Sequence, residues 1–157
     1  MNLQTYFLFP FAIGLLLTKF GIINFKLALL CGVMGMIIDI DHYIEHILHA
    51  KSNRFSLRAA WNNSIKLHRF NQRSFVHYWV GALILSILFA VITYFSWSVA
   101  LVLAIGYYSH LLLDFVFHLK KEKYFRKKIE QFYLKESYLE IMLDLILVLT
   151  IIFLLWL

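Results

Sequence analysis

Long apolar stretches, separated by polar and basic segments, make up most of the chain. Five of these stretches approach the roughly 20 residues that an α-helix needs to cross a bilayer. The pattern predicts an all-α fold, an integral membrane bundle of about five transmembrane helices that forms a single domain over residues 1–157. A bundle with four spanning helices and an interfacial first segment is the alternative, because the first stretch is the shortest. The five stretches are residues 3–18, 22–48, 75–95, 97–118 and 138–157.

The second stretch indicates how long its helix is and where neighbouring helices approach it. Its apolar residues keep a helical period past the first acidic residues as far as Leu48, which predicts one continuous helix. Gly32 and Gly35 in this helix allow a neighbouring helix to approach closely. Little more than Ser96 separates the third stretch from the fourth, so these two are expected to form a tight helical hairpin.

The two longer polar segments are basic and carry aromatic residues. Residues 50–74 form a loop between the second and third stretches. Between the fourth and fifth stretches, apolar and charged side chains fall largely on opposite sides of a short helix, which is typical of an amphipathic helix lying on the membrane surface. The apolar side of this predicted helix consists of Tyr124, Phe125, Ile129, Phe132 and Tyr133.

Composition and charge fit a membrane protein and set its orientation. Hydrophobic residues make up 62% of the chain, and the mean hydropathy is +0.74. The single cysteine, Cys31, excludes an internal disulfide framework. The chain has 15 Lys and Arg against 9 Asp and Glu, and thirteen of the basic residues lie in residues 51–73 and 120–135. The positive-inside rule places both basic segments and the N-terminus in the cytoplasm and the protein in the plasma (inner) membrane.

The same distribution of charge indicates the partners. Basic clusters beside apolar helices bind the anionic head groups of membrane lipids. No recognised nucleic-acid motif or soluble fold accompanies the charge, so we expect no nucleic-acid partner. The N-terminus lacks the basic start and small-residue cleavage site of a secretory signal, so we expect the first stretch to be retained as a helix.

This topology brings the ionisable residues of the apolar stretches to one leaflet. The second and fourth stretches end on the cytoplasmic side, and the third and fifth begin there. Ionisable residues within a membrane are expensive and are candidates for a functional site. The residues that converge are Asp39, Asp41, His42, His77, His110, Asp114, His118, Glu140 and Asp144.

Helical spacing groups these residues further. His110, Asp114 and His118 are four residues apart and share one helical face. Asp39, His42 and His46, at steps of three and four, share another. Mixed carboxylate and imidazole ligands suit Zn, Mn or another borderline divalent metal ion. Such a cluster is able to hold one or two metal ions and to activate a water molecule for attack on phosphorus or a carbonyl carbon.

Each of these residues also has a purely structural interpretation. Carboxylate and imidazole pairs are able to neutralise one another within a bundle without any metal. Glu140 and Asp144 are open to roles as ligands, as partners of ligands, or as ion-pair partners of the preceding basic segment. For His46, His49 and His118, a polar tip at the membrane interface explains the residue as well as ligation does.

Three sequence elements resemble the YdjM-type membrane-bound metal-dependent hydrolases. That family carries a Pro-Asp-Ile-Asp element, a His-Arg-Gly-x-Thr-His element and a Gly-Tyr-x-Ser-His-x-x-x-Asp element, in this order. Here the corresponding segments are Ile-Asp-Ile-Asp-His, ending at His42, Arg-Ser-Phe-Val-His, ending at His77, and Gly-Tyr-Tyr-Ser-His-Leu-Leu-Leu-Asp, ending at Asp114. Ile38 stands where the family has Pro, and Gln72 stands where it has the first His of the middle element.

The resemblance implies a metal-dependent hydrolase, and the ligands it implies are Asp39, Asp41, His42, His77, His110 and Asp114. We therefore predict hydrolysis of a lipid-borne phosphoester or ester at the cytoplasmic interface. Asp41 or Glu45, whichever is not a ligand, is expected to act as the general base. Arg69 and Arg73 are expected to hold a phosphate, because guanidinium binds phosphate bidentately.

Two other classes of function stay open at this point. One is a transporter of ions, protons or metals that uses the same His and Asp residues as a relay. The other is a non-catalytic membrane scaffold whose cluster is a structural metal or ion-pair site. The sequence leaves the substrate, the number of metal ions and the oligomeric state undetermined.

Overall fold

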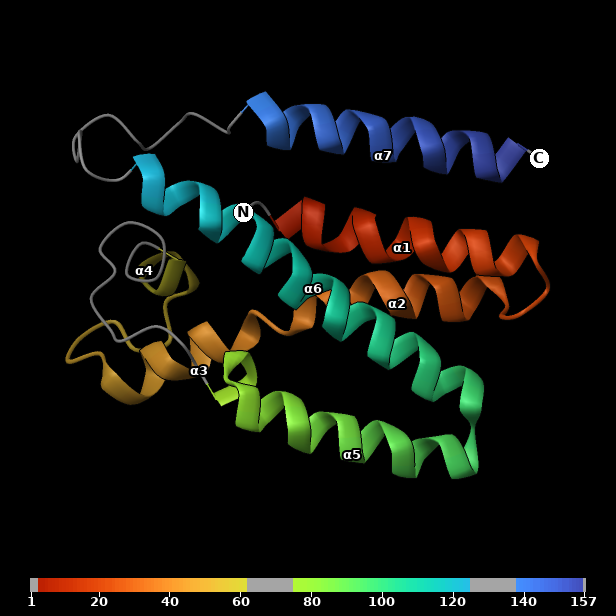
Figure 1. The fold of residues 1–157 in the computed structure, drawn as a ribbon. Helices are drawn as coiled ribbons and strands as arrows, with labels where there is room; N and C mark the ends of the chain where they lie inside the picture. The colour runs from red at the N-terminus through yellow and green to blue at the C-terminus, as the bar shows by residue number, and fades with distance from the viewer. Residues whose placement is uncertain (1–2, 62–74, 125–137, 157) are drawn as a thin grey trace. The chain divides into compact units, whose positions relative to one another are not determined.

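The computed structural model describes residues 3–61, 75–124 and 138–156. Within these ranges every regular element is a helix, which confirms the predicted all-α class (Figure 1). The predicted amphipathic helix at 124–133 lies outside the described residues except for its first residue. The elements are α1 (Leu3–Lys19), α2 (Phe25–Ile37), α3 (Ile40–His49), α4 (Leu57–Trp61), η2 (Phe75–His77), α5 (Trp79–Phe95), α6 (Trp97–Tyr124) and α7 (Tyr138–Trp156).

The chain divides into two compact units. Unit 1 comprises residues 1–36 and 88–157, and therefore contains α1, most of α2, the end of α5, α6 and α7. Unit 2 comprises residues 37–87 and contains α3, α4, η2 and the start of α5. The single domain expected from the sequence stays a prediction.

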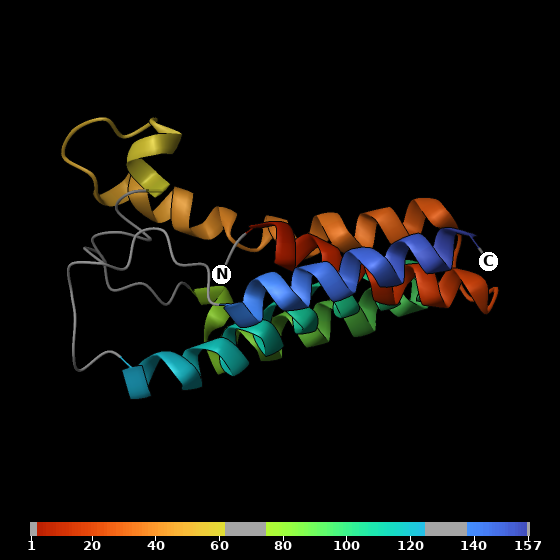
Figure 2. The ribbon, with the colours of Figure 1, turned by 90° about the horizontal axis from the view of Figure 1, so that it is seen from above.

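In unit 1, α1, α2 and α7 run nearly parallel, and α6 crosses them obliquely (Figures 1 and 2). α1 lies beside α7 and forms an antiparallel hairpin with α2, and α6 packs on both α1 and α2. Side-chain contacts show which ends meet: Gln4 contacts Asp144, and Tyr6 contacts Asp114. The first turns of α1 and α7 therefore lie at the same end of the unit as the acidic part of α6.

Two local features of the backbone form the turn between α1 and α2. Gly21 has a φ of +70°, a backbone conformation that glycine adopts without steric cost, and its amide bonds the Thr18 carbonyl at 3.0 Å. The Asn24 side chain then accepts a hydrogen bond of 3.0 Å from the Leu27 amide, which caps the start of α2. The chain thus reverses direction over a few residues.

Small residues set the distance between the helices of unit 1. A methyl group on Gly14 would lie 2.8 Å from the Ala28 backbone, and one on Gly32 would lie 2.7 Å from the Phe7 ring. A methyl group on Gly35 would overlap the Tyr6 carbonyl oxygen. The predicted close approach at Gly32 and Gly35 is therefore confirmed. Close packing of this kind replaces the hydrophobic driving force that is missing between helices in lipid.

In unit 2, the structure corrects the prediction of one helix from residue 22 to Leu48. α2 ends at Ile37, a turn follows at Ile38 and Asp39, and α3 begins at Ile40. The break falls at the first charged residue after the apolar run. Periodicity alone missed it because the apolar positions keep their spacing across the turn. Beyond the break α3 is amphipathic, and its exposed apolar residues recur every four positions at Ile40, Ile44 and Leu48.

The described helices differ in whether they are long enough to cross a membrane. By length and composition, Trp97–Val116 of α6 passes that test. The apolar helices α1, α2 and α5 are shorter, with 17, 13 and 17 residues. Five transmembrane helices are therefore not confirmed, although the five predicted apolar segments all contain helices.

Candidate metal centre

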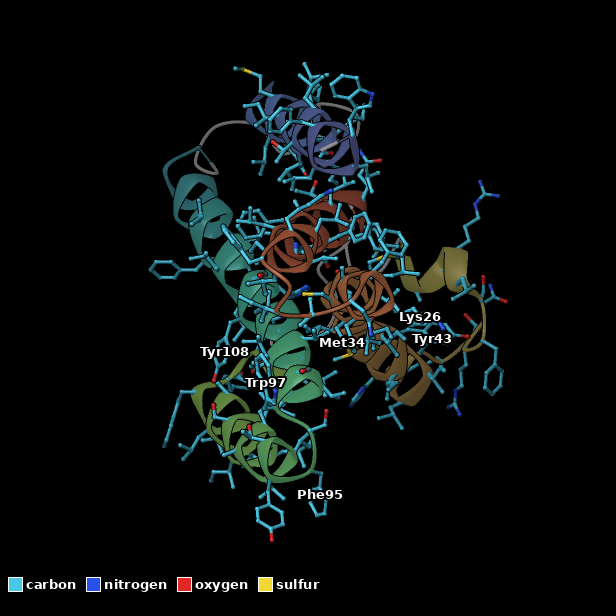
Figure 3. All side chains as sticks on the ribbon, turned by 90° about the vertical axis from the view of Figure 1, so that its right-hand side faces the viewer. Lys26, Met34, Tyr43, Phe95, Trp97 and Tyr108 are labelled. Atoms are coloured by element: carbon cyan, nitrogen blue, oxygen red, sulfur yellow. The ribbon has the colours of Figure 1, made fainter. Side chains whose placement is uncertain are left out.

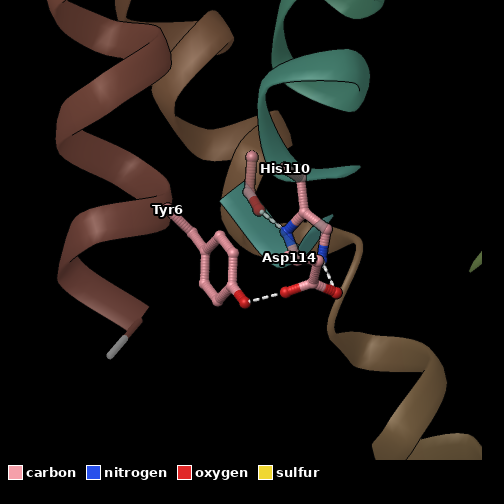
Figure 4. Close-up of polar contacts among 4 residues, drawn as sticks. Tyr6, His110 and Asp114 are labelled. Carbon is pink, nitrogen blue, oxygen red and sulfur yellow. Dashed lines mark hydrogen bonds and ion pairs between the residues drawn. The ribbon is translucent and has the colours of Figure 1, made fainter. Parts of the chain in front are cut away.

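His110 is the best-fixed member of the predicted cluster. Its side chain is fully buried in unit 1, and its Nδ1 lies 2.8 Å from the Gly35 carbonyl oxygen (Figure 4). A carbonyl only accepts hydrogen bonds, so Nδ1 carries the proton and donates it, which leaves the lone pair on Nε2 in the neutral ring. Gly35 lies in the last turn of α2, where carbonyls have no amide partner within the helix.

The close approach of α2 and α6 makes this hydrogen bond possible. Gly106 lies one helical turn before His110, and a methyl group there would come within 2.6 Å of the Met34 side chain and 2.9 Å of the Cys31 carbonyl. Only glycine at this position lets the two backbones approach so closely. Figure 3 shows Met34 in this contact, between α2 and α6.

Asp114 lies one turn after His110 on the same face of α6, as its spacing predicted. Its Oδ2 is 3.8 Å from Nε2 of His110, and the two side chains are 38% and 0% exposed. The other oxygen, Oδ1, accepts a hydrogen bond from the Tyr6 hydroxyl. The Tyr6 ring also stacks on the His110 ring, with centroids 4.1 Å apart and planes at 23°. One residue of α1 therefore orients both side chains (Figure 4).

Asp39 and His77 come together in unit 2. Asp39 lies in the turn between α2 and α3, and His77 closes the short helix η2 just before α5. Both side chains are half-buried, and a ligand atom of each lies within 4.8 Å of the other. They form part of a candidate metal-binding group of His and Asp side chains, from two sequence elements that are almost forty residues apart.

These donors fit a borderline divalent metal ion. Two ligand atoms on one tetrahedral zinc lie about 3.3 Å apart, given bonds of about 2.0–2.1 Å. The 3.8 Å between Nε2 of His110 and Oδ2 of Asp114 is close to that value. Both atoms carry lone pairs in the neutral imidazole and the ionised carboxylate, so a cation between them relieves their repulsion. The hydrogen bond from Nδ1 to a carbonyl is the usual support of a metal-bound histidine.

The two acids of α7 lie at the same end of unit 1. Glu140 is buried, and Asp144 accepts a hydrogen bond of 2.9 Å from the Gln4 side chain of α1. The other oxygen of Asp144 is buried and has no hydrogen-bond partner. These contacts join α7 to α1, and a role as metal ligands stays a prediction.

Histidines outside the cluster have other positions. His46 is 1% exposed, and its Nε2 lies 3.2 Å from the Asn53 carbonyl, so it ties the end of α3 to the following loop. Burial of His46 does not fit an interfacial polar tip, and its role as a ligand stays a prediction. His49, in the last turn of α3, is exposed.

Several predicted site residues lie outside what the structure describes. Asp41, His42 and Glu45 belong to α3, and His118 belongs to α6, but the placement of these four side chains is not described. Arg69 and Arg73 fall within residues 62–74, which the described ranges omit. Their predicted roles as ligands, general base and phosphate-binding residues stay predictions.

Comparison with protein families decides the relationship of the chain. A family model described as YdjM inner membrane protein matches residues 1–118 of the 157. The chain belongs to the YdjM inner membrane protein family. Neither a comparison with curated proteins nor one with solved structures gives a match. The predicted family is thus confirmed, and the YdjM name supports a location in the inner membrane.

The YdjM match covers α1 to α6 up to residue 118, and so includes all three elements on which the resemblance was based. At Ile38, where the YdjM-type element has Pro, the chain still leaves the helix at that residue. The break that positions Asp39 therefore does not depend on proline.

Tyr6 is a site residue that the sequence interpretation missed. Most of its helix is apolar, and the sequence of α1 does not by itself specify a contact with α6, more than a hundred residues later. One signal was available: Gln4, Thr5 and Tyr6 form a polar group at the end of α1 where the ionisable residues were expected to converge.

Changing Tyr6→Phe tests this contact. The phenylalanine ring keeps the stacking on His110 but cannot donate a hydrogen bond to Asp114. Losing a residue that hydrogen-bonds a metal ligand weakens metal binding by roughly 10- to 100-fold. We therefore expect a decrease of that order in the affinity for zinc, measured by competition with a fluorescent chelator. Phe7→Tyr, one residue along α1, serves as a control, and an unchanged affinity in Tyr6→Phe would contradict the proposed orienting role.

Proposed function

We propose that this YdjM family member is a membrane-embedded metal-dependent hydrolase that acts at the cytoplasmic interface on a lipid-borne phosphoester or ester. One observation carries the proposal. His110 is buried with its Nδ1–H on the Gly35 carbonyl, so that Nε2 faces the Asp114 carboxylate at 3.8 Å. Such an arrangement presents two ligand atoms to a cation and holds them there before the cation binds.

The proposed metal ligands include Asp39 and His77 of unit 2 and His110 and Asp114 of unit 1. Chain connectivity supports bringing them together. Asp39 follows Gly35 by four residues, so its Cα lies within about 14 Å of the glycine that bonds His110. Two imidazoles and one or two carboxylates suit zinc or manganese, and three protein ligands leave a position for water, as catalytic zinc sites do.

A metal ion held by these ligands would lower the pKa of a bound water molecule and would polarise the bond to be cleaved. The residues of the chain supply the rest of the proposed chemistry. Asp41 or Glu45 accepts the proton of the attacking water. Arg69 and Arg73 bind the phosphate and place its phosphorus atom toward that water. Tyr6 holds Asp114 in position through its hydroxyl group.

The orientation in the membrane is part of the proposal. Thirteen of fifteen basic residues lie in residues 51–73 and 120–135, and we propose that both segments and the N-terminus are cytoplasmic. These segments concentrate anionic lipids beside the site.

The decisive experiment combines metal analysis with a substrate screen. Purified protein in detergent is analysed by inductively coupled plasma mass spectrometry and then incubated with phospholipids and lipid-linked phosphates in the presence of Zn²⁺ or Mn²⁺. We expect stoichiometric metal and release of a water-soluble phosphate or fatty acid that a chelator stops. Metal-free protein without hydrolytic activity would contradict the proposal and favour a scaffold role.

A further inference from the structure

One side of α3 is an exposed apolar stripe, and the chain that follows α3 packs on another side. The Tyr43 hydroxyl donates a hydrogen bond of 3.0 Å to the Phe55 carbonyl. The buried His46 ring lies 3.2 Å from the Asn53 carbonyl. Ile44 and His46 are two residues apart, which places them about 160° apart around the helix axis. The loop after α3 therefore lies away from the stripe. The stripe consists of Ile40, Ile44 and Leu48, which are 49%, 52% and 66% exposed.

The start of α3 lies beside the start of α5 in unit 2. Asp39 immediately precedes α3, and one of its oxygens lies within 4.8 Å of a ring nitrogen of His77. Tyr78 and Trp79 follow His77 directly and are 46% and 77% exposed. Exposed Tyr and Trp at the end of an apolar helix are typical of the interface between membrane and water. The start of α3 is therefore expected at the depth of the lipid head groups.

The residues that follow α3 are basic. Lys51, Arg54 and Arg58 are all exposed, and residues 46–113 contain no Asp or Glu. The Nε of Arg54 donates a hydrogen bond of 2.7 Å to the carbonyl of Ala50, the residue that ends α3, so this arginine is held at the end of the helix. Positive charge without nearby carboxylates complements the phosphates of anionic phospholipids.

We propose that α3 lies flat in the membrane interface, with its apolar stripe in the acyl chains and the basic residues 51–58 on the phosphates of anionic phospholipids. α3 has 10 residues, about half of what a helix needs to cross a bilayer, so its apolar side is suited to lying on the membrane and not to spanning it. This membrane anchor goes beyond the proposed hydrolysis, because it requires neither a metal ion nor a substrate.

Spin-label accessibility identifies what covers the stripe. Cys31 is replaced by Ala, and a nitroxide is attached at Ile44→Cys or Leu48→Cys in protein reconstituted in vesicles of phosphatidylethanolamine and phosphatidylglycerol. Oxygen concentrates in lipid, and we expect it to relax both labels several-fold more than a water-soluble nickel complex does. Ser52→Cys, in the exposed loop, is the aqueous control, and Phe115→Cys, exposed on α6, is the lipid control.

Two results of this experiment would overturn the proposal. Relaxation by the nickel complex to the level of the Ser52→Cys label would place the stripe in water. Shielding from both reagents would place it against protein, either a second copy of the chain or another segment of the same chain. Neither result depends on whether the protein binds a metal ion or hydrolyses a lipid, so the proposed function stands or falls separately.

Energy transfer tests the preference for anionic lipid. A donor fluorophore at Ser52→Cys is measured against phosphatidylglycerol or phosphatidylcholine that carries the same acceptor on one acyl chain. We expect several-fold more transfer to phosphatidylglycerol, and less of this preference at high salt, which screens exposed charges. Lys51→Gln combined with Arg58→Gln should remove most of the preference, whereas Lys26→Gln, an exposed lysine of α2, should keep it. Equal transfer to the two lipids, or a preference unchanged in the double variant, would overturn the proposal.

Discussion

Purified His110→Ala protein is expected to contain no bound divalent metal ion, whereas the wild-type protein retains its metal through gel filtration in metal-free buffer. The substitution removes the proposed ligand whose ring is fully buried and hydrogen-bonded to the Gly35 carbonyl. Losing a residue that only hydrogen-bonds a ligand weakens metal binding by roughly 10- to 100-fold. The metal affinity of His110→Ala should fall by more than that. Inductively coupled plasma mass spectrometry of both proteins measures the effect.

His49→Ala is the matched control for this experiment. His49 is an exposed histidine in the last turn of α3, and its removal should leave the metal content at the wild-type level. Equal metal in wild type and His110→Ala would show that His110 is not a ligand. Negligible metal in all three proteins would remove the hydrolase mechanism altogether.

Gly35→Val is expected to cause the largest loss of stability of any single substitution in unit 1. Its first methyl carbon would overlap the Tyr6 carbonyl oxygen and lie 2.8 Å from the Pro10 ring. A backbone atom cannot rotate away as a side chain can, so α1 and α2 must separate. Overpacking costs typically about 1–3 kcal/mol, and a clash with backbone belongs at the upper end. Thermal unfolding in detergent, followed by circular dichroism, measures the decrease.

Ala90→Val places a comparable change on the exposed face of α5 and should leave the unfolding temperature unchanged. Separation of α1 from α2 also displaces Tyr6 and the Gly35 carbonyl, the two groups that orient His110 and Asp114. Metal retention in Gly35→Val should therefore fall together with stability. A stable Gly35→Val protein with normal metal content would contradict the packing described for α1, α2 and α6.

The helices themselves were predictable from the sequence, because long apolar runs leave few alternatives to a helix. Gly32 and Gly35 also indicated where helices meet, since glycine is costly within a helix unless something packs against it. The turn at Ile38 and Asp39 was not predictable from periodicity. Apolar residues on its two sides keep helical spacing, although α2 ends at Ile37 and α3 begins at Ile40.

For the candidate site, prediction succeeded where spacing along one helix decides the geometry. His110 and Asp114 share a face of α6 because they are four residues apart. The partners that hold them could not be predicted, because Tyr6 and Gly35 reach them from other helices through packing that no local pattern encodes.

The position at which α2 ends affects the protonation of a histidine on another helix. An α2 longer by one turn would pair the Gly35 carbonyl with the amide of Asp39, since helical amides bond the carbonyl four residues earlier. The imidazole on α6 would then lose the acceptor that decides which of its nitrogens is protonated. In this protein the stopping point of one helix selects the tautomer of a histidine on another, so insertions near Ile38 would change the protonation of His110 without altering any residue of α6.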